Sequence, residues 1–404
     1  MDPVRLAEQT VDRAQLQALI ARALETPAYA SEWEGVDLDD WESLPLLTKE
    51  RLVEASSGAD PFGGRLAVDP AELAYVFVAA GPLYMPFTAA DLTAMAKSYA
   101  HAFTNAGLTD ADLVDQTTMY NWVIAATVIT EGLRMVGCGV VPGGVGRTEL
   151  HLDTIRALGV TGIVAFPTFL EHLLRQADAA GIELPLRKAV LMGELSNPNL
   201  ERHFEDAYGL VAREFYGTAD VGVVASECAA GQGMHLRSDL VIEFIDPATA
   251  VAALPEPGHP MELVVSDLSR RAMPIVRLRT GDLVDSVFRD ACRCGDDQPR
   301  IARIVGRSTE ITKIKGMFLV PSTITRALAS ASLDCAFQVI IQRRPGGQDD
   351  PRLALASPKP ANALAIEEAI ERAARMKIPL EWDAVIAENS PLVLDLRDEA
   401  VGSR

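Results

Sequence analysis

The chain has 404 residues, of which 49% are apolar, and a formal net charge of −19. This length predicts two domains, and the apolar fraction is enough to fill one large core and one smaller core. The negative charge, with no cluster of Lys and Arg, disfavours nucleic acid and anionic membranes as partners.

The sequence also bounds the compartment. No apolar run reaches the roughly 18 residues that a membrane-spanning helix needs, and residues 1–28 mix charged and apolar side chains in an amphipathic helical pattern. We therefore expect neither a signal peptide nor a membrane anchor. The five cysteines are an odd number in a large chain, which argues against a disulfide framework. These features predict a cytoplasmic protein.

The first half of the chain alternates short apolar strands with helices. After an N-terminal helix and a second helix capped by Thr48, the pattern predicts strands at 75–78, 140–141, 162–165 and 189–192, and helices at 91–106, 122–136, 149–158, 168–180 and 199–208. Strands this short and this apolar are typical of a parallel sheet that helices cover on both faces. The predicted fold class is therefore α/β.

Beyond Gly217 the pattern becomes β-rich, and a new unit begins after Arg307. Three strands are predicted between Pro- and Gly-rich turns, at 240–244, 261–266 and 274–278. The last hundred residues, the size of a small domain, show strands at 311–314 and 339–342 and a helix at 364–375. We predict a large N-terminal domain (1–307), with helix-covered parallel sheets and a β-rich subdomain, and a small, mobile α+β domain (308–404).

Two segments resemble the paired signature of adenylate-forming enzymes. They are Arg277-Leu-Arg-Thr-Gly-Asp282 and the run from Gly306-Arg-Ser-Thr-Glu to Pro321-Ser322. The length of the second segment and its Pro-Ser ending are similar to the phenylacetate–CoA ligase branch. Weaker similarities follow in the family's order at 44–49, 166–170, 193–194 and 215–220.

The resemblance implies nucleotide-binding roles for five residues. Asp282, expected at the turn after the last β-rich strand, is similar to the carboxylate that accepts both ribose hydroxyls of ATP or AMP, because two acceptor oxygens suit a cis-diol. A surface turn aspartate is its alternative. Arg307 resembles a second ribose contact, and an ordinary surface ion pair is its alternative. Tyr216 resembles the ring placed against adenine, with a core tyrosine as the alternative, and Gly217 and Thr218 belong to the same run.

The phosphate-binding segment departs from the family pattern. Where the family has a lysine and a Ser/Thr/Gly-rich loop, residues 78–88 contain Pro82 and Pro86, which lack N–H donors. Asp220 replaces the family's metal-binding Glu, so we expect magnesium binding that is weakened but retained. Four bulky side chains are expected to face the phosphate position: Leu83, Tyr84, Met85 and Phe87.

The C-terminal unit lacks two further family positions. Thr309 stands at the hinge aspartate, and no lysine follows Lys377, where the family has its catalytic lysine. Lys313 and Lys315 lie on the first strand of this unit, where they could face the active site or a CoA phosphate, or line a solvated strand edge. Asp220 and Lys315 are the candidate catalytic residues.

Three cysteines and one histidine form a candidate metal set: Cys228, His235, Cys292 and Cys294. This set fills a tetrahedral sphere and leaves no open position for water, which favours a structural zinc. Phenylacetate–CoA ligase-like sequences are similar at these positions; buried free thiols are the alternative. The remaining histidines show no partner set and no base role is assigned to them: His101, His151, His172, His203 and His259.

Three functions are compatible with these features. The first is a carboxylic-acid-activating ligase that forms an acyl adenylate from ATP and transfers the acyl group to CoA, a carrier thiol or an amine. The second is ATP-independent acyl transfer, condensation or cyclisation of an acyl thioester, and the third is a non-catalytic partner protein. A homodimer and the identity of the acid stay open. Candidates for an apolar wall around the acid, with ordinary core packing as the alternative, are Trp122, Phe166, Phe169 and Met192.

Overall fold

The computed structural model describes residues 12–397 except 80–82, 195–197, 248, 257–259, 285, 309–311, 315–316, 320, 345–347, 375 and 388–389. Residues 80–83 aside, the chain forms a large compact unit up to Gly306 and a small compact unit from Arg307 onward. Among the described residues, no helix is both long and apolar enough to cross a membrane.

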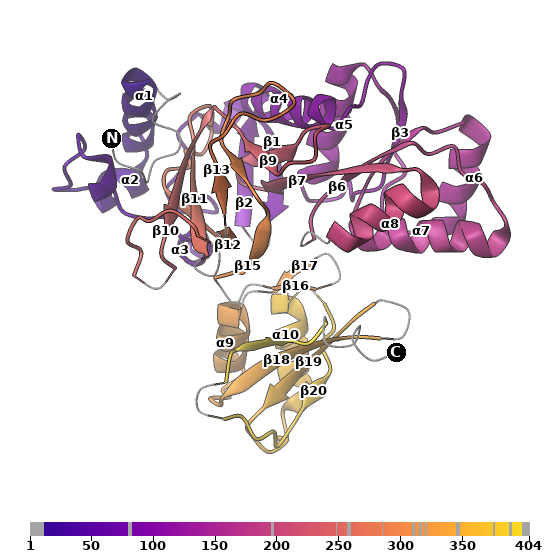
Figure 1. Cartoon of the computed structure of the whole chain (residues 1–404). Coiled ribbons are helices and arrows are strands. Elements are labelled where there is room, and N and C mark those ends of the chain that lie inside the picture. Colours follow the sequence, from indigo (N-terminus) through magenta and orange to yellow (C-terminus); the bar gives the residue numbers. More distant parts are fainter. Residues whose placement is uncertain are drawn as a thin grey trace. The chain divides into compact units, whose positions relative to one another are not determined.

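A nine-stranded sheet forms the centre of the large unit, in the order β13-β14-β9-β8-β7-β6-β5-β3-β4 (Figure 1). The five strands from β7 to β4 in this order are parallel. These are β3 (Leu113–Gln116), β4 (Gly139–Val141), β5 (Gly162–Ala165), β6 (Lys188–Leu191) and β7 (Val211–Thr218). The helices that connect them are α5 (Ala125–Val136), α6 (Thr148–Leu158), α7 (Pro167–Ala180) and α8 (Pro198–Tyr208).

The rest of this sheet is antiparallel. It consists of β8 (Gly222–Glu227), β9 (Met234–Leu236), β13 (Val287–Phe288) and β14 (Arg300–Ile301). The strands predicted at 140–141, 162–165 and 189–192 are confirmed as β4, β5 and β6, and β5 is apolar and buried throughout. The parallel strands β3 and β7 were not predicted, and the strand predicted at 75–78 does not belong to this sheet.

A second, four-stranded sheet of the large unit has the order β10-β11-β12-β15. Its strands are β10 (Leu240–Ile245), β11 (Met261–Asp267), β12 (Leu278–Val284) and β15 (Ile304–Arg307). A hairpin precedes the long helix α4 (Ala89–Asn105) and consists of β1 (Leu73–Ala79) and β2 (Leu83–Thr88). The N-terminal segment contains α1 (Arg13–Leu24), α2 (Pro27–Glu32), α3 (Lys49–Ala55) and short 3₁₀ turns at Trp41–Ser43 and Pro70–Glu72.

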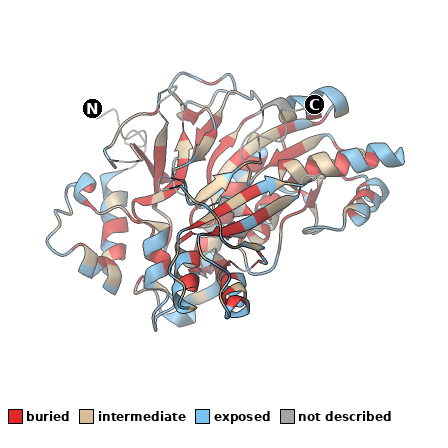
Figure 2. Cartoon of the chain, turned by 90° about the horizontal axis from the view of Figure 1, so that it is seen from below, coloured by how far each residue is buried: buried red, intermediate tan, exposed pale blue. Residues whose placement is uncertain are grey.

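The small unit has its own sheet and core. A four-stranded sheet has the order β20-β19-β18-β21, and a separate hairpin pairs β16 with β17. The elements are β16 (Thr312–Ile314), β17 (Met317–Leu319), α9 (Pro321–Ser330), β18 (Phe337–Arg343), β19 (Asp349–Leu355), α10 (Ala363–Ala374), β20 (Leu380–Glu381) and β21 (Val393–Asp395). Figure 2 shows that buried residues concentrate in the strands and on one face of the helices.

Two expectations about local structure are wrong. The strand expected at 274–278 begins instead at Leu278, because Arg277 has a left-handed backbone (φ 49°). The buried Arg277 guanidinium holds this kink by donating to Glu243 Oε1 at 2.9 Å and to the Leu44 carbonyl at 2.5 Å. Asp282 therefore lies within β12, not at a turn. The helix expected from Trp122 begins at Ala125, since Trp122 also has a positive φ of 68°.

Candidate functional site

The carboxyl ends of β3 and β5 mark the point where the parallel sheet changes direction. From β3 the chain continues through α5 to β4 on one side, whereas from β5 it continues through α7 to β6 on the other. Open α/β sheets bind ligands outside the carboxyl ends of such a strand pair. This edge of the sheet is therefore a candidate small-molecule site.

Tyr216 and Asp282, two of the predicted nucleotide-binding residues, are in contact. Tyr216 lies on β7, and its hydroxyl donates to Asp282 Oδ2 of β12 at 2.7 Å, although the two are 66 residues apart in the sequence. Asp282 is buried, and its backbone N–H donates to Thr280 Oγ1 at 3.1 Å. The structure thus brings an aromatic ring and a fixed carboxylate together from two different sheets.

Gly217 and Thr218 end β7 next to this pair. A Cβ on Gly217 would lie 2.7 Å from the Gly222 carbonyl, so the close approach of β7 and β8 requires glycine here. The Thr218 hydroxyl oxygen is buried and has no hydrogen-bond partner among the described residues. Because a buried polar group without a partner costs free energy, this hydroxyl is available to a ligand or a water molecule.

Asp220 follows in the turn between β7 and β8, and a lysine from the N-terminal segment neutralises it. Its side chain is 2% exposed, and Oδ2 lies 2.9 Å from Lys49 Nζ. Lys49 is the first residue of α3, whose N-cap is Thr48. Sequence reasoning missed Lys49 as a site residue; the only signal was its place at the end of the family-like segment 44–49.

A second cation lies buried near Asp220. Arg270 Nη2 donates to the Pro86 carbonyl at 2.9 Å, and the guanidinium carbon lies 3.4 Å from the centre of the Phe87 ring. Burial lowers the pKa of Arg270 to about 10, although Asp91, Asp267 and Asp220 favour the charged form. Arg270 therefore stays protonated at neutral pH and adds to the positive potential at Asp220.

The structure corrects part of the expectation for the phosphate-binding segment. Leu83, Met85 and Phe87 belong to β2 and are at most 2% exposed, so they pack into the core and do not face phosphates. Tyr84 alternates to the opposite face and is exposed. The turn itself, with Pro82, lies outside the described residues, so its shortage of N–H donors stays a prediction.

The site residues of the C-terminal signature stay predictions as well. Arg307 is exposed, ends β15 and is the first residue of the small unit. Lys315 and Thr309 lie outside the described residues.

Three of the four side chains proposed for the acid-binding wall follow parallel strands. Phe166 comes directly after β5, Phe169 lies in the first turn of α7 that follows, Met192 comes directly after β6, and all three are half-buried. Trp122 differs, because it is 75% exposed. Phe166, Phe169 and Met192 stay candidates at the edge identified above.

His151 is buried and paired, which the sequence did not indicate. Its Nδ1 lies 2.6 Å from Asp115 Oδ2, its Nε2 lies 3.2 Å from the Gly144 carbonyl, and its ring packs edge-on against Phe169. Both partners are acceptors, so both ring nitrogens carry protons. Burial favours the neutral ring, but the hydrogen bond and charge of Asp115 outweigh it and raise the pKa of His151.

The four predicted metal ligands come together in the structure. All their ligand atoms lie within 4.8 Å of one another, with Cys228 Sγ 3.7 Å from Cys292 Sγ and Cys294 Sγ 3.4 Å from His235 Nε2. Zn–S bonds of about 2.3 Å in a tetrahedron place two sulfur atoms about 3.8 Å apart, so the spacing fits zinc. Asp296 Oδ2 lies 3.5 Å from His235 Nδ1, where a carboxylate can orient a metal-bound imidazole.

Comparison with known proteins finds phenylacetate–coenzyme A ligases that are similar to most of the chain. No family model matches the chain. It is 27% identical over 365 residues to the phenylacetate–coenzyme A ligase of Thermus thermophilus, covering 85% of this chain and 80% of that protein. It is 29% identical over 344 residues to the phenylacetate–coenzyme A ligase of Aromatoleum evansii, covering 80% of this chain and 77% of that protein.

The fold is also that of a solved ligase. The crystal structure of 2-hydroxyisobutyryl-CoA ligase with 2-HIB-AMP and CoA matches with a TM-score of 0.83 at 22% identity, over 97% of this chain and 92% of that chain. The signature segments, the curated relatives and the fold all indicate similarity to acid–CoA ligases. Over most of its length the chain is therefore similar to phenylacetate–coenzyme A ligases, and its fold is that of an adenylate-forming acid–CoA ligase.

Proposed function

We propose that the protein activates a small carboxylic acid with ATP, forms an acyl adenylate and pyrophosphate, and transfers the acyl group to CoA or a carrier thiol. The curated relatives are named as CoA ligases of an aryl acid. The observation that carries the proposal is the contact between Lys49 and Asp220. Lys49 supplies a cation beside the turn that carries Asp220, although the phosphate-binding segment has no lysine of its own.

The residues of the site divide the work by their chemistry. Asp282 accepts the ribose hydroxyls, Tyr216 packs against adenine, and Gly217 and Thr218 lie beside the nucleotide. Asp220 would hold magnesium, which would offset part of the negative charge of the triphosphate.

In the first step a carboxylate oxygen of the acid attacks the α-phosphorus, and the bond to pyrophosphate breaks. Lys49 stabilises the negative charge that develops on the phosphate oxygens. In the second step a thiol attacks the acyl carbonyl and AMP leaves. For this step we propose Arg307, at the boundary between the two predicted domains, and Lys315 of the small domain (308–404) as the contacts to ribose and phosphate.

We also propose that Cys228, His235, Cys292 and Cys294 hold a structural zinc. Three of these residues are buried and the set completes a tetrahedron, which leaves no position for a reacting water. The structure contains no disulfide among the described cysteines. Free thiols kept for a metal match a reducing compartment, which supports the cytoplasm.

Calorimetry and pyrophosphate release test the proposed reaction. Titration with ATP–magnesium, AMP and CoA should show nucleotide binding, and a panel of aryl and alkyl acids should contain at least one that releases pyrophosphate. An Asp282→Asn variant should lose AMP affinity by roughly tenfold or more, because one ribose acceptor becomes a donor. If neither ATP nor AMP binds, the ligase proposal is wrong, and ATP-independent acyl transfer or a non-catalytic role replaces it.

A further inference from the structure

Arg237 contacts the turn between β7 and β8 that carries Asp220. It follows β9 directly, its side chain is 9% exposed, and Nη1 donates to the Val221 carbonyl at 2.7 Å and to the Val223 carbonyl at 2.9 Å. The two carbonyls flank Gly222, which has a left-handed φ of 76°. One guanidinium nitrogen therefore fixes both sides of the turn.

Helix α4 packs closely against the same turn. A Cβ on Gly222 would lie 2.7 Å from Met95 Cγ and 3.3 Å from Ser98 Oγ, both on α4. Since the turn is held by Arg237 and pressed against α4, the position of Asp220 depends on both contacts.

Charges of alternating sign connect Arg237 to Asp220 through the interior. Arg237 Nη2 lies 3.6 Å from Asp267 Oδ2, and Asp267 is 2% exposed. Asp267 and Asp220 both act electrostatically on the buried Arg270, and Asp220 contacts Lys49. Removing the Arg237 guanidinium leaves Asp267 with one cationic neighbour fewer. We then expect the charged side chains between Asp267 and Lys49 to rearrange.

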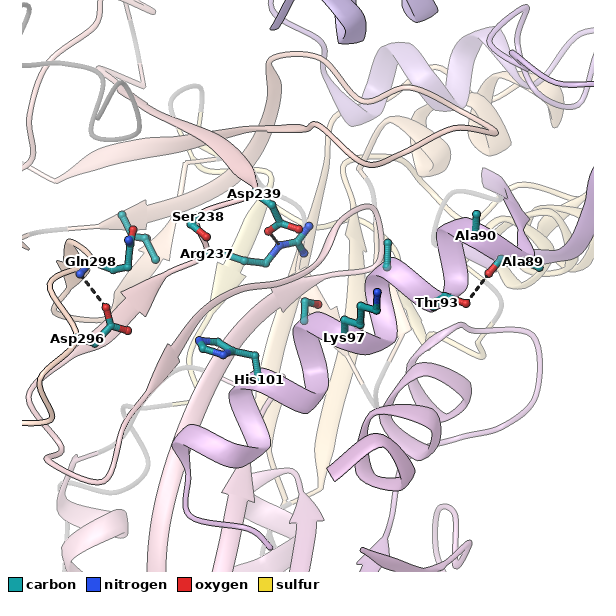
Figure 3. Close-up of a pocket in the computed structure, with 13 residues that line it drawn as sticks. Ala89, Ala90, Thr93, Lys97, His101, Arg237, Ser238, Asp239, Asp296 and Gln298 are labelled. Atoms are coloured by element: carbon teal, nitrogen blue, oxygen red, sulfur yellow. Dashed lines mark hydrogen bonds and ion pairs between the residues drawn. The ribbon is translucent and has the colours of Figure 1, made fainter. Parts of the chain in front are cut away.

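Arg237 also lines a cavity of about 790 Å³ together with residues of α4. Figure 3 shows Arg237 beside its carboxylate partner Asp239, with Lys97 and His101 on α4 across the cavity. Lys97 shares the cavity and the positive charge, but it is exposed and has no hydrogen bond or ion pair with the turn among the described residues. Lys97 is therefore a matched control for Arg237.

We propose that Arg237 is a positioning residue for Asp220. Through the position of Asp220 it raises the affinity for ATP–magnesium, although it contacts neither the nucleotide nor the metal. The proposal rests on the proposed function for its kinetic consequence, whereas its structural consequence can be measured without any reaction.

The kinetic test compares Arg237→Met, Arg237→Lys and Lys97→Met. Arg237→Met should raise the KM for ATP–magnesium roughly tenfold or more with a smaller change in kcat, because two buried carbonyls lose their donor and the turn shifts. Arg237→Lys keeps a charge and a donor and should recover part of the loss. Lys97→Met should match the wild type.

The structural test measures the NMR signal of the Lys49 side chain. The chain has only seven lysines, so reductive ¹³C-methylation gives a simple NMR spectrum in which a Lys49→Arg variant assigns the Lys49 signal. That signal should shift in Arg237→Met and in Gly222→Ala, which disturbs the turn from the α4 side, but not in Lys97→Met.

An unchanged Lys49 signal in both Arg237→Met and Gly222→Ala overturns the proposal, even if thermal stability falls. A KM that is unchanged in an active Arg237→Met enzyme overturns it as well. If the wild type releases no pyrophosphate with any acid, the proposed function fails, and the lysine spectrum alone decides the role of Arg237.

Discussion

The charge of Lys49 has a structural partner, and we propose that it also acts in the reaction. Its ammonium group lies 2.9 Å from a carboxylate that is almost completely buried. Replacing it by Met leaves Asp220 without its nearest cation and removes a charge from the phosphate position. We predict that Lys49→Met lowers kcat/KM for pyrophosphate release by about 10²-fold, comparable with the loss of one transition-state donor. Lys49→Arg should retain part of the activity.

Lys188 gives the matched control for this prediction. It forms the same type of pair, 2.8 Å from Asp112, with a similarly half-buried side chain. That pair lies at the amino ends of β3 and β6, the opposite edge of the parallel sheet. Lys188→Met should therefore lower thermal stability but leave kcat/KM within about twofold. Equal losses of activity in Lys49→Met and Lys188→Met would show that Lys49 acts only through stability.

The buried His151–Asp115 pair predicts a pH-dependent stability. The pKa of His151 is raised in the folded chain above its unfolded value of about 6.5. Its stabilisation is therefore complete below about pH 6.5 and is lost as the pH rises through the folded pKa. At pH 6, His151→Gln should destabilise the large unit by about 3–5 kcal/mol, as expected when one partner of a buried pair is removed.

Thermal unfolding at pH 6 and pH 9 measures this effect. The difference in Tm between wild type and His151→Gln should be smaller at pH 9. His101→Gln is the control, because His101 is exposed and should give a small difference at both values. A His151→Gln difference that does not change with pH would contradict a charged imidazole.

These residues also show what the sequence could predict about the site. Cys228, His235, Cys292 and Cys294 were found because cysteine is rare in the chain and its chemistry narrows the choice. The partners Lys49 and Asp220, or His151 and Asp115, lie far apart in the sequence and form no ligand motif. Only the packing of the strands and helices brings them together, so no periodicity or spacing indicates these pairs.

At the scale of elements, the antiparallel strands β10 and β11 were predicted within one residue of their bounds, whereas the parallel strands β3 and β7 were not predicted. Short apolar runs between helical patterns gave β5 and β6 within one residue of their bounds. The start of β12 was missed because a distant ion pair with Glu243 kinks the chain at Arg277. Strands of two residues, such as β13 and β14, are too short for any period to appear.

The metal set ties together some of these short elements. Cys228 follows β8, His235 lies on β9, and Cys292 and Cys294 lie in the segment before β14. We predict one zinc per chain, and its loss in Cys292→Ser with a fall in Tm of roughly 5–10 °C. Metal analysis and thermal unfolding measure both. Cys335→Ser, in the small unit, should keep its zinc. A wild type that neither contains zinc nor binds it on addition would contradict the site.

At the scale of the whole molecule, each unit has a core of its own. The small unit buries a cluster that includes Ile324, Val339, Leu353 and Ile366, all within its own sequence. The large unit contains Tyr216, Asp282 and the complete metal set. A unit that encloses its own core can fold alone, so the proposed division of the site between two domains can be tested by separating them.

We predict that a chain ending at Gly306 folds, contains one zinc and binds AMP within about tenfold of the full-length protein, because Asp282 supplies the ribose acceptors. It should form little or no acyl thioester, since Arg307 and Lys315 are absent. Calorimetry with AMP, metal analysis and a thioester assay measure the three properties, and adding residues 307–404 as a separate chain is the control for restored transfer. A truncated chain that folds and carries zinc but does not bind AMP would place the nucleotide site in the small unit. Full transfer activity without residues 307–404 would remove the small unit from the mechanism.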